Sequence, residues 1–180
     1  MMQFARHAAA WLVCVSLAAA ALAQSPRANQ SVPTSALPAP THPVILTITG
    51  AITRRNTGDA ASFDAAMIDE LPVHEFRTWT PWFKESVTFR GPRLQSVLQA
   101  VGAKGQTLHI IALNDYAVDV PVSDASQFDP ILARRIDGKV LGVRDKGPLF
   151  LIYPFDSKPE TRTDLFYGRS IWQVTRITVQ

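Results

Sequence analysis

The chain has 180 residues, of which 47% are hydrophobic and 18% are charged, and its formal net charge is +3 at neutral pH. This charge is too small and too dispersed for a nucleic-acid surface, which needs a basic stripe, so nucleic acid is excluded as a partner. The only cysteine, Cys14, lies in an apolar N-terminal run, so the rest of the chain has no disulfide, thiol nucleophile or thiolate metal ligand.

Residues 1–23 have the pattern of a secretory signal peptide. Arg6 supplies a positive charge, residues 8–20 are apolar, and Ala21-Leu22-Ala23 is a cleavage site of the small-x-small type. The apolar run is too short for a membrane span. We therefore expect cleavage after Ala23 and a periplasmic or secreted mature protein.

Residues 24–43 contain five prolines among serine, alanine and threonine. This composition favours extended conformations and buries no core, so we expect a flexible leader. Residues 44–180 remain, which is enough for one domain with its own core.

The first half of this domain alternates between predicted strands and helices. Residues 44–49 are β-branched and end at Gly50, and the polar turn 54–59 is suited to a hairpin. Ser62 is expected to cap a short helix that ends at Pro72.

A third strand is predicted over residues 73–80, and Pro92 is expected in the first turn of a second helix. Gly102 fits the C-terminal cap of that helix. Its apolar positions have helical spacing: Leu94, Val97, Leu98 and Val101.

The second half of the domain is rich in β-forming residues. Asn114-Asp115 tolerates the left-handed backbone of a tight hairpin turn, and Asp137-Gly138 marks another turn. Residues 154–167 form a long polar excursion. The predicted strands are residues 107–113, 116–122, 131–136, 139–143, 149–153 and 171–179. The pattern predicts a β-dominated α+β domain with a few short helices.

The stretch Arg77–Gly91 is chemically unusual, because two tryptophans, three threonines, two arginines and a lysine occur where a strand runs into a loop. Indole faces beside hydroxyl and guanidinium groups suit a flat, polar, heteroaromatic ligand. An aromatic flap over the core, followed by a solvated loop, explains the same composition.

Few residues are suited to catalysis or metal binding. His42, His74 and His109 have no second ligand at a spacing that fits a metal site, and there is no nucleophile elbow or base–nucleophile pair. We therefore expect no catalytic residue and no metal site.

The remaining polar and aromatic groups favour ligand binding. Some have simpler explanations: Asn114-Asp115 as an ordinary hairpin turn, Trp172 as a core residue, and Lys146-Gly147-Pro148 as a surface loop. The candidate ligand-binding residues are Thr78, Trp79, Thr80, Trp82, Arg90, Asn114, Asp115, Tyr116, Lys146 and Arg169.

Several short motifs occur in a characteristic order. They are Leu71-Pro72, Thr78-Trp79-Thr80-Pro81-Trp82, Phe89-x-Gly91-x-x-Leu94-x-x-Val97-Leu98, Ala112-Leu113-Asn114-Asp115-Tyr116, Asp137-Gly138, Lys146-Gly147-Pro148-Leu149, Tyr153-Pro154 and Arg169-x-x-Trp172. As an ordered set they resemble the small exported proteins of the sulfite-oxidase fold, usually labelled oxidoreductase molybdopterin-binding domain. The resemblance covers essentially the whole mature domain and implies a mixed α/β fold with a pterin-shaped cleft.

The chain departs from the catalytic members of that family in one respect. They carry a molybdenum-ligating cysteine at a position that falls near Trp79 or Thr80, where this chain has none. Thiolate ligation is central to holding a redox metal. In addition, Arg6 is followed by His7 rather than a second arginine, which suggests export before folding and before cofactor insertion. Molybdopterin is therefore less favoured than a free pterin.

The resemblance is instead to the cysteine-less branch, which includes periplasmic pterin-binding proteins. It implies a non-catalytic sensor that reports to the periplasmic domain of an inner-membrane enzyme that makes or degrades cyclic di-GMP. Trp82 or Trp79 would stack on the pterin, and Asp115 or Asn114 would pair with its amino-pyrimidine edge. Arg90, Lys146 and Arg169 would contact the oxo group of the pterin or the hydroxyls of its side chain.

Two other functions explain parts of the same sequence. One is a molybdopterin-dependent oxidoreductase, which the missing cysteine disfavours. The other is a partner-binding module with a vestigial cleft, because stacking residues also serve as interface hot spots.

Overall fold

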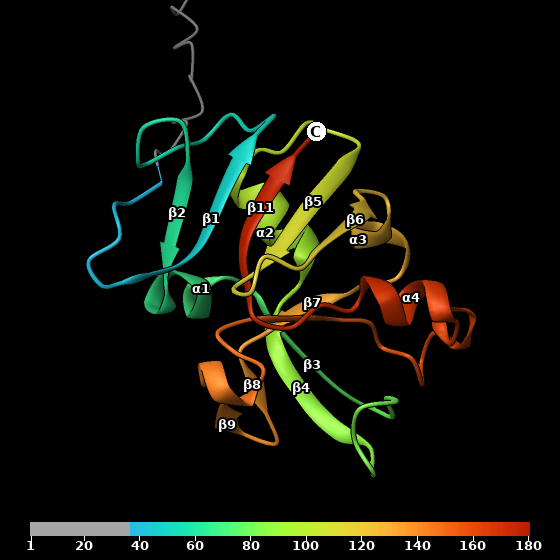
Figure 1. The fold of residues 1–180 in the computed structure, drawn as a ribbon. Helices are drawn as coiled ribbons and strands as arrows, with labels where there is room; N and C mark the ends of the chain where they lie inside the picture. Colours follow the sequence, from blue (N-terminus) through green and yellow to red (C-terminus); the bar gives the residue numbers. More distant parts are fainter. Residues whose placement is uncertain (1–36) are drawn as a thin grey trace, which may run out of the picture. The chain divides into compact units, whose positions relative to one another are not determined.

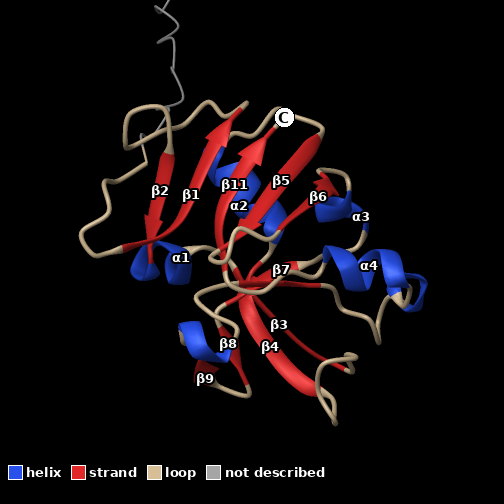
Figure 2. Ribbon diagram, viewed as in Figure 1, coloured by secondary structure: helices blue, strands red, loops and turns tan. Residues whose placement is uncertain are grey.

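A computed structural model describes residues 37–180, so the predicted signal peptide and residues 24–36 of the predicted leader lie outside the described residues. The described part is α+β and dominated by strands, with only short helices, which confirms the predicted fold class (Figures 1 and 2). No helix within residues 37–180 is long and apolar enough to cross a membrane.

The largest sheet has five strands in the order β2-β1-β11-β5-β6. The central pair, β1 and β11, is parallel, and the other pairs are antiparallel. Figure 1 shows the last strand of the chain inserted between β1 and β5. The strand bounds are β1 (Val44–Gly50), β2 (Ala61–Asp64), β5 (Thr107–Ala112), β6 (Ala117–Pro121) and β11 (Val174–Val179).

Helix α2 (Leu94–Val101) packs against one face of this sheet. Its four apolar positions at helical spacing are all buried, as the spacing predicts. Gly102 closes the helix with a φ of 60°, a left-handed conformation that glycine adopts without steric cost. The prediction of this helix is confirmed, although it begins two residues later than expected, because Pro92 is the last residue of a strand.

A second core is mainly aromatic and lies between two smaller sheets. Residues Phe89, Phe150, Tyr153 and Phe155 are fully buried there. One sheet has the order β3-β4-β8-β9, and the other pairs β7 with β10. The bounds are β3 (Val73–Thr78), β4 (Val87–Pro92), β7 (Ile131–Ala133), β8 (Arg135–Ile136), β9 (Lys139–Val140) and β10 (Phe150–Ile152).

The remaining elements are short helices. They are α1 (Ala65–Glu70), α3 (Asp124–Gln127), α4 (Asp164–Arg169) and the 3₁₀ turns η1 (Val143–Asp145) and η2 (Pro159–Thr161).

Three local predictions were wrong. Ser62 does not cap a helix: it lies within β2, and Asp64 caps α1 by accepting the Met67 N–H. Pairing with β1 keeps residues 61–64 extended and buries them. The run 131–136 is two strands, because β7 pairs with β10 whereas β8 pairs with β4. The polar excursion 154–167 includes most of α4.

Residues 37–43, the last part of the predicted leader, contact the domain. Leu37 packs against the larger core, and Asn56 donates to the Pro38 carbonyl. The backbone N–H groups of Thr41 and His42 both donate to the Asp64 carboxylate. This part of the leader is therefore held against β2 and its turn.

Candidate functional site

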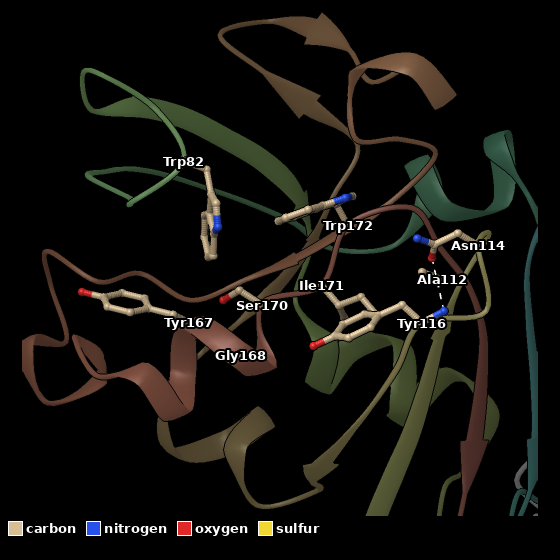
Figure 3. A pocket seen from close by; sticks show the side chains of 9 residues that line it. All are labelled: Trp82, Ala112, Asn114, Tyr116, Tyr167, Gly168, Ser170, Ile171 and Trp172. Carbon is tan, nitrogen blue, oxygen red and sulfur yellow. Dashed lines mark hydrogen bonds between the residues drawn. The ribbon is translucent and has the colours of Figure 1, made fainter.

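A cavity of about 300 Å³ lies where three loops meet. The loop between β3 and β4 contributes one wall, and the turn between β5 and β6 contributes another. The third wall is formed by the end of α4 and the segment that connects α4 to β11 (Figure 3). Its lining residues are Trp82, Ala112, Asn114, Tyr116, Tyr167, Gly168, Ser170, Ile171 and Trp172.

Three aromatic rings form a corner of this cavity. The Trp82 ring lies edge-on to Trp172, with centroids 5.9 Å apart and an interplanar angle of 76°. It is also edge-on to Tyr167, at 6.2 Å and 84°. Edge-to-face packing is one of the arrangements that the charge distribution of aromatic rings favours. Figure 3 shows Trp82 and Tyr167 at one end of the group of lining side chains, Asn114 and Tyr116 at the other, and Trp172 between Trp82 and Asn114.

The Trp82 ring also packs against the aromatic core, and this contact fixes its position. Its ring lies 5.8 Å from Phe150 and 6.4 Å from Phe155, both of which are fully buried. Its backbone N–H donates to the Thr80 hydroxyl. The indole is therefore held in one orientation rather than displayed on a free loop.

Two polar side chains face the aromatic corner from the β5–β6 turn. The Asn114 Oδ1 accepts the Tyr116 N–H at 3.2 Å, and among the described residues its amide NH₂ makes no hydrogen bond. The Tyr116 side chain is 55% exposed at the cavity rim. The hydroxyl of Ser170 donates to the Phe166 carbonyl, so it is already engaged. On the β5–β6 turn, the Asn114 amide and the Tyr116 phenol remain for a ligand.

Of the ten candidate binding residues, the structure brings three to this cavity. They are Trp82, Asn114 and Tyr116. The other seven have different positions, and most of these have partners of their own within the protein.

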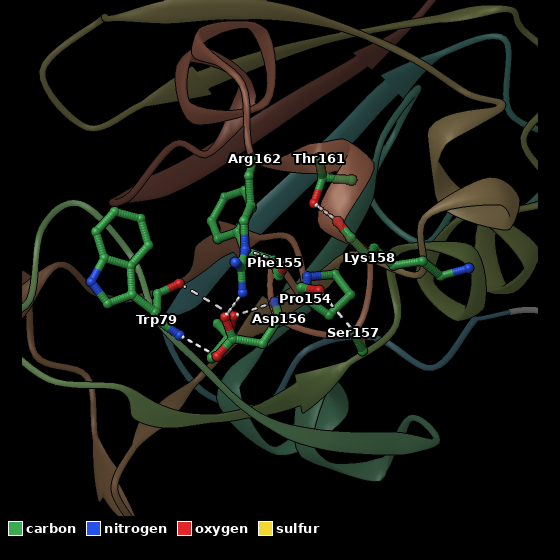
Figure 4. A network of polar contacts seen from close by, with 9 residues as sticks. Trp79, Pro154, Phe155, Asp156, Ser157, Lys158, Thr161 and Arg162 are labelled. Atoms are coloured by element: carbon green, nitrogen blue, oxygen red, sulfur yellow. Dashed lines mark hydrogen bonds and ion pairs between the residues drawn. The ribbon is translucent and has the colours of Figure 1, made fainter.

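Thr78 and Trp79 hold the loop that contains Asp156 in place, and Figure 4 shows Trp79 beside Asp156. The Asp156 carboxylate accepts the Trp79 N–H at 2.8 Å, and the Asp156 N–H donates to the Thr78 hydroxyl at 2.9 Å. Arg162 completes the network by pairing with Asp156 and donating to the Phe155 carbonyl. The hydroxyl of Thr78 is buried and engaged in this network.

Thr80, Arg90 and Asp115 also lie away from the cavity lining. Thr80 is buried and accepts the Trp82 N–H, and Arg90 pairs with the exposed Glu75 at 3.4 Å. Asp115 has a φ of 62° and pairs with Arg176 at 2.6 Å. The left-handed turn predicted at Asn114-Asp115 is therefore confirmed, but its two side chains have different surroundings.

Lys146 lies behind one aromatic wall of the cavity. Its Nζ is 4.0 Å from the centroid of the Trp172 ring and 5.9 Å from that of Phe83. Both distances fit cation–π contacts. Burial lowers the pKa of the Lys146 ammonium below its ordinary value.

Arg169 is engaged in a buried polar network. Its guanidinium donates to Asp124 Oδ2 at 2.9 Å, and the hydroxyl of Tyr153 donates to the same oxygen at 2.7 Å. Burial, together with the hydrogen bond to Asp124, raises the pKa of Tyr153 above its ordinary value. Arg169 therefore holds the end of α4, whereas its neighbour Gly168 lines the cavity.

Sequence reasoning missed two of the three rings of the aromatic corner. Trp172 was interpreted as core, although it is only half-buried and lines the cavity. Tyr167 was placed in a polar excursion. The available signal was the proximity of the two residues to Arg169 in sequence, because the family-like motif Arg169-x-x-Trp172 already marked this segment.

The described residues contain no group of three or more His, Cys, Asp or Glu side chains arranged to hold a metal ion. The chain matches no protein-family model and no curated protein sequence.

Proposed function

We propose that this protein is a periplasmic, non-catalytic pterin-binding protein that relays the state of its ligand to an inner-membrane enzyme of cyclic di-GMP signalling. The observation that carries the proposal is the aromatic corner formed by Trp82, Tyr167 and Trp172, which faces the amide of Asn114 across one small cavity.

The shape and chemistry of the cavity favour a flat bicyclic ligand. Its volume of about 300 Å³ is at the lower end of the range for small-molecule sites. Ring faces of Trp82 and Trp172 supply stacking surfaces. The free amide of Asn114 donates two hydrogen bonds, and a pterin ring carries an oxo group and ring nitrogens that accept them.

The residues do not fit molybdopterin. No cysteine is present outside the predicted signal peptide, and the positions nearest the expected ligand are occupied by Trp79 and Thr80. The Thr80 side chain is buried and already accepts a backbone N–H, and a hydroxyl is a poor substitute for a thiolate. The cationic Arg169 is paired with Asp124. We derive no redox step for this site.

The rim of the cavity supports the relay to a partner. Leu113 and Tyr116 are 53% and 55% exposed, and both belong to the same turn as Asn114. A ligand bound by Asn114 would therefore order the backbone of a turn that displays two large exposed side chains. Exposed apolar and aromatic groups of this kind are frequent in protein interfaces. The alternative of a partner-binding module without ligand uses the same surface.

Calorimetric titration of residues 24–180 with oxidised and reduced pterins tests the proposal. We expect saturable binding that Trp82→Ala abolishes. Trp79→Ala is the comparison variant: Trp79 is 41% exposed and does not line the cavity, but its ring packs edge-on against Tyr167 at 6.5 Å, so this variant should lose much less affinity than Trp82→Ala. Trp82→Phe keeps an aromatic ring and should retain part of the affinity if Trp82→Ala is poorly folded.

Binding that survives in Trp82→Ala would rule out the aromatic corner as the site. A folded wild-type protein that binds no pterin would leave the partner-binding module as the better account.

A further inference from the structure

Strand β3 is the outer strand of its sheet, because the order β3-β4-β8-β9 gives it a neighbour on one side only (Figure 1). Its pairing with β4 places Glu75 opposite Arg90. In the same pairing, Arg77 lies opposite Thr88. Within residues 37–180 no strand pairs with the other edge of β3. An unpaired edge of this kind is a template for a further strand.

The backbone groups of Glu75 and Arg77 point toward this free edge. On β4, the Thr88 carbonyl accepts the Asp137 N–H at 2.8 Å, and the Thr88 N–H donates to the Asp137 carboxylate at 2.9 Å. The Arg90 carbonyl likewise accepts an N–H from the residue that precedes β8, at 2.9 Å. Thr88 and Arg90 therefore direct their backbone groups away from β3, and in an antiparallel pair the residues opposite them point the other way.

The side chains along this edge carry opposite charges two residues apart. Glu75 contacts Arg90 at 3.4 Å, and both side chains are half exposed. Arg77 is exposed and forms no ion pair with a carboxylate among the described residues. An edge with charges of one sign repels a second copy of itself, whereas an edge with alternating signs is self-complementary.

We propose that this edge pairs with the same edge of a second copy of the chain, so that two β3 strands lie antiparallel across a two-fold axis. A register centred on Glu75 sets that carboxylate opposite itself, and one centred on Arg77 does the same with guanidinium groups; both place like charges together. The register centred on Phe76 sets Glu75 of each copy opposite Arg77 of the other. Because the backbone groups of these two residues point outward, each such pair exchanges backbone hydrogen bonds as well as an ion pair.

The apolar side chains of the edge fit the same register. Phe76 is half-buried, and its ring lies 6.1 Å from that of Phe89 in the aromatic core. On the axis it lies beside Phe76 of the second copy in a non-hydrogen-bonded pair, in which side chains approach most closely. Val73 and Trp79, which are 39% and 41% exposed, come opposite one another at the ends.

The free edge is short. It ends at Trp79, whose N–H donates to the Asp156 carboxylate at 2.8 Å and is therefore not available to a further strand. Pairing over so few residues buries little surface, so we expect a weak dimer that forms at high protein concentration. The dimer needs no ligand, so this inference is independent of the proposed function.

Sedimentation velocity of the purified protein over a range of concentrations tests the inference. We expect a monomer–dimer equilibrium in the wild type. Glu75→Arg sets arginine opposite arginine in both pairs and should weaken dimerisation at least about tenfold, and Arg77→Glu should do the same with carboxylates. Lys104→Glu is the matched control, because Lys104 is an exposed lysine outside β3, and it should dimerise like the wild type.

Restoration then identifies the register. The double variant that combines Glu75→Arg with Arg77→Glu exchanges the two charges and should dimerise again. An equimolar mixture of the two single variants should form a heterodimer for the same reason. Arg77→Glu remains informative if Glu75→Arg folds poorly, because Arg77 has no ion pair to lose among the described residues.

Amide hydrogen exchange followed by NMR locates the contact. The N–H groups of Glu75 and Arg77 should exchange more slowly as the protein concentration rises. The N–H of Phe76 is directed toward β4, so its exchange should not depend on concentration.

A protein that stays monomeric at every concentration would overturn the inference. So would a dimer that both single charge variants leave intact, or a mixture of the two variants that does not associate, because charge would then not set the register. None of these results bears on the pterin site, which calorimetry with Trp82→Ala tests separately.

Discussion

The Arg169 guanidinium donates to Asp124 Oδ2 across 2.9 Å, and this contact joins the last residue of α4 to the first residue of α3. The side chains are only 18% and 4% exposed, respectively. Because Tyr167 and Gly168 of the same helix line the cavity, the ion pair supports one wall of the candidate site from a distance.

Replacement of Asp124 with asparagine should destabilise the protein by about 3 kcal/mol, because it leaves a largely buried guanidinium without its counter-ion. The affinity for a cavity ligand should also fall, since α4 loses an anchor. Urea unfolding and calorimetry measure the two effects. Glu75→Gln is the matched control: its ion pair with Arg90 is half exposed on both sides, so the loss should stay below about 1 kcal/mol. Equal losses in the two variants would contradict the special role of Asp124.

At Gly91 the backbone of β4 lies directly against the backbone of β7. A Cβ atom built at this position would overlap the Leu132 carbonyl oxygen and lie 2.8 Å from the Ala133 Cα. Because both are backbone atoms, no side-chain rotation relieves the clash. Gly91→Ala should therefore lower the free energy of unfolding by about 3 kcal/mol or more.

Gly168→Ala is the matched control for that variant. Nothing lies within 4 Å of a Cβ at Gly168, which is in helix α4, so alanine there should be neutral or slightly stabilising. Thermal unfolding of the two variants separates the effects. A wild-type melting temperature for Gly91→Ala would show that β4 and β7 are not so closely packed.

Features set by neighbouring residues could be predicted from the sequence. The apolar spacing in α2 and the cap at Gly102 depend only on residues within one helix. The turns at Asp115 and Asp137-Gly138 likewise follow from the ability of these residues to adopt positive φ. The balance of strands and short helices follows from the sum of such local signals.

Features that depend on contacts between residues far apart in the sequence could not be predicted from it. Residues 131–136 have a continuous strand pattern, and only the competing partners β10 and β4 divide it. Trp79 and Trp82 are both tryptophans in the same loop, so the sequence does not distinguish them. In the structure, Asp156, 77 residues away, accepts the Trp79 N–H and holds the backbone there, whereas Trp82 lines the cavity. The candidate site was therefore found in part: its first tryptophan and its turn were predicted, and its second tryptophan was not.

The last prediction concerns acid stability. The Asp64 carboxylate accepts N–H groups from Met67, Thr41 and His42 at 3.0, 2.9 and 3.1 Å. The hydrogen bond from Met67 is the largest cause that lowers the pKa of Asp64, which falls from 3.8 to about 2 although burial acts in the opposite direction. The folded state therefore binds this proton less readily than the unfolded chain does.

It follows that Asp64 contributes stability above pH 4, and that this contribution is lost as the pH falls from about 4 to 2. Melting temperatures measured across this range should decline less steeply in Asp64→Asn than in the wild type, and the two curves should converge near pH 2. Asp59→Asn is the matched control, because Asp59 is exposed and nearby, and its curve should follow the wild type. Parallel curves for the wild type and Asp64→Asn would show that the three N–H groups do not favour the charged carboxylate.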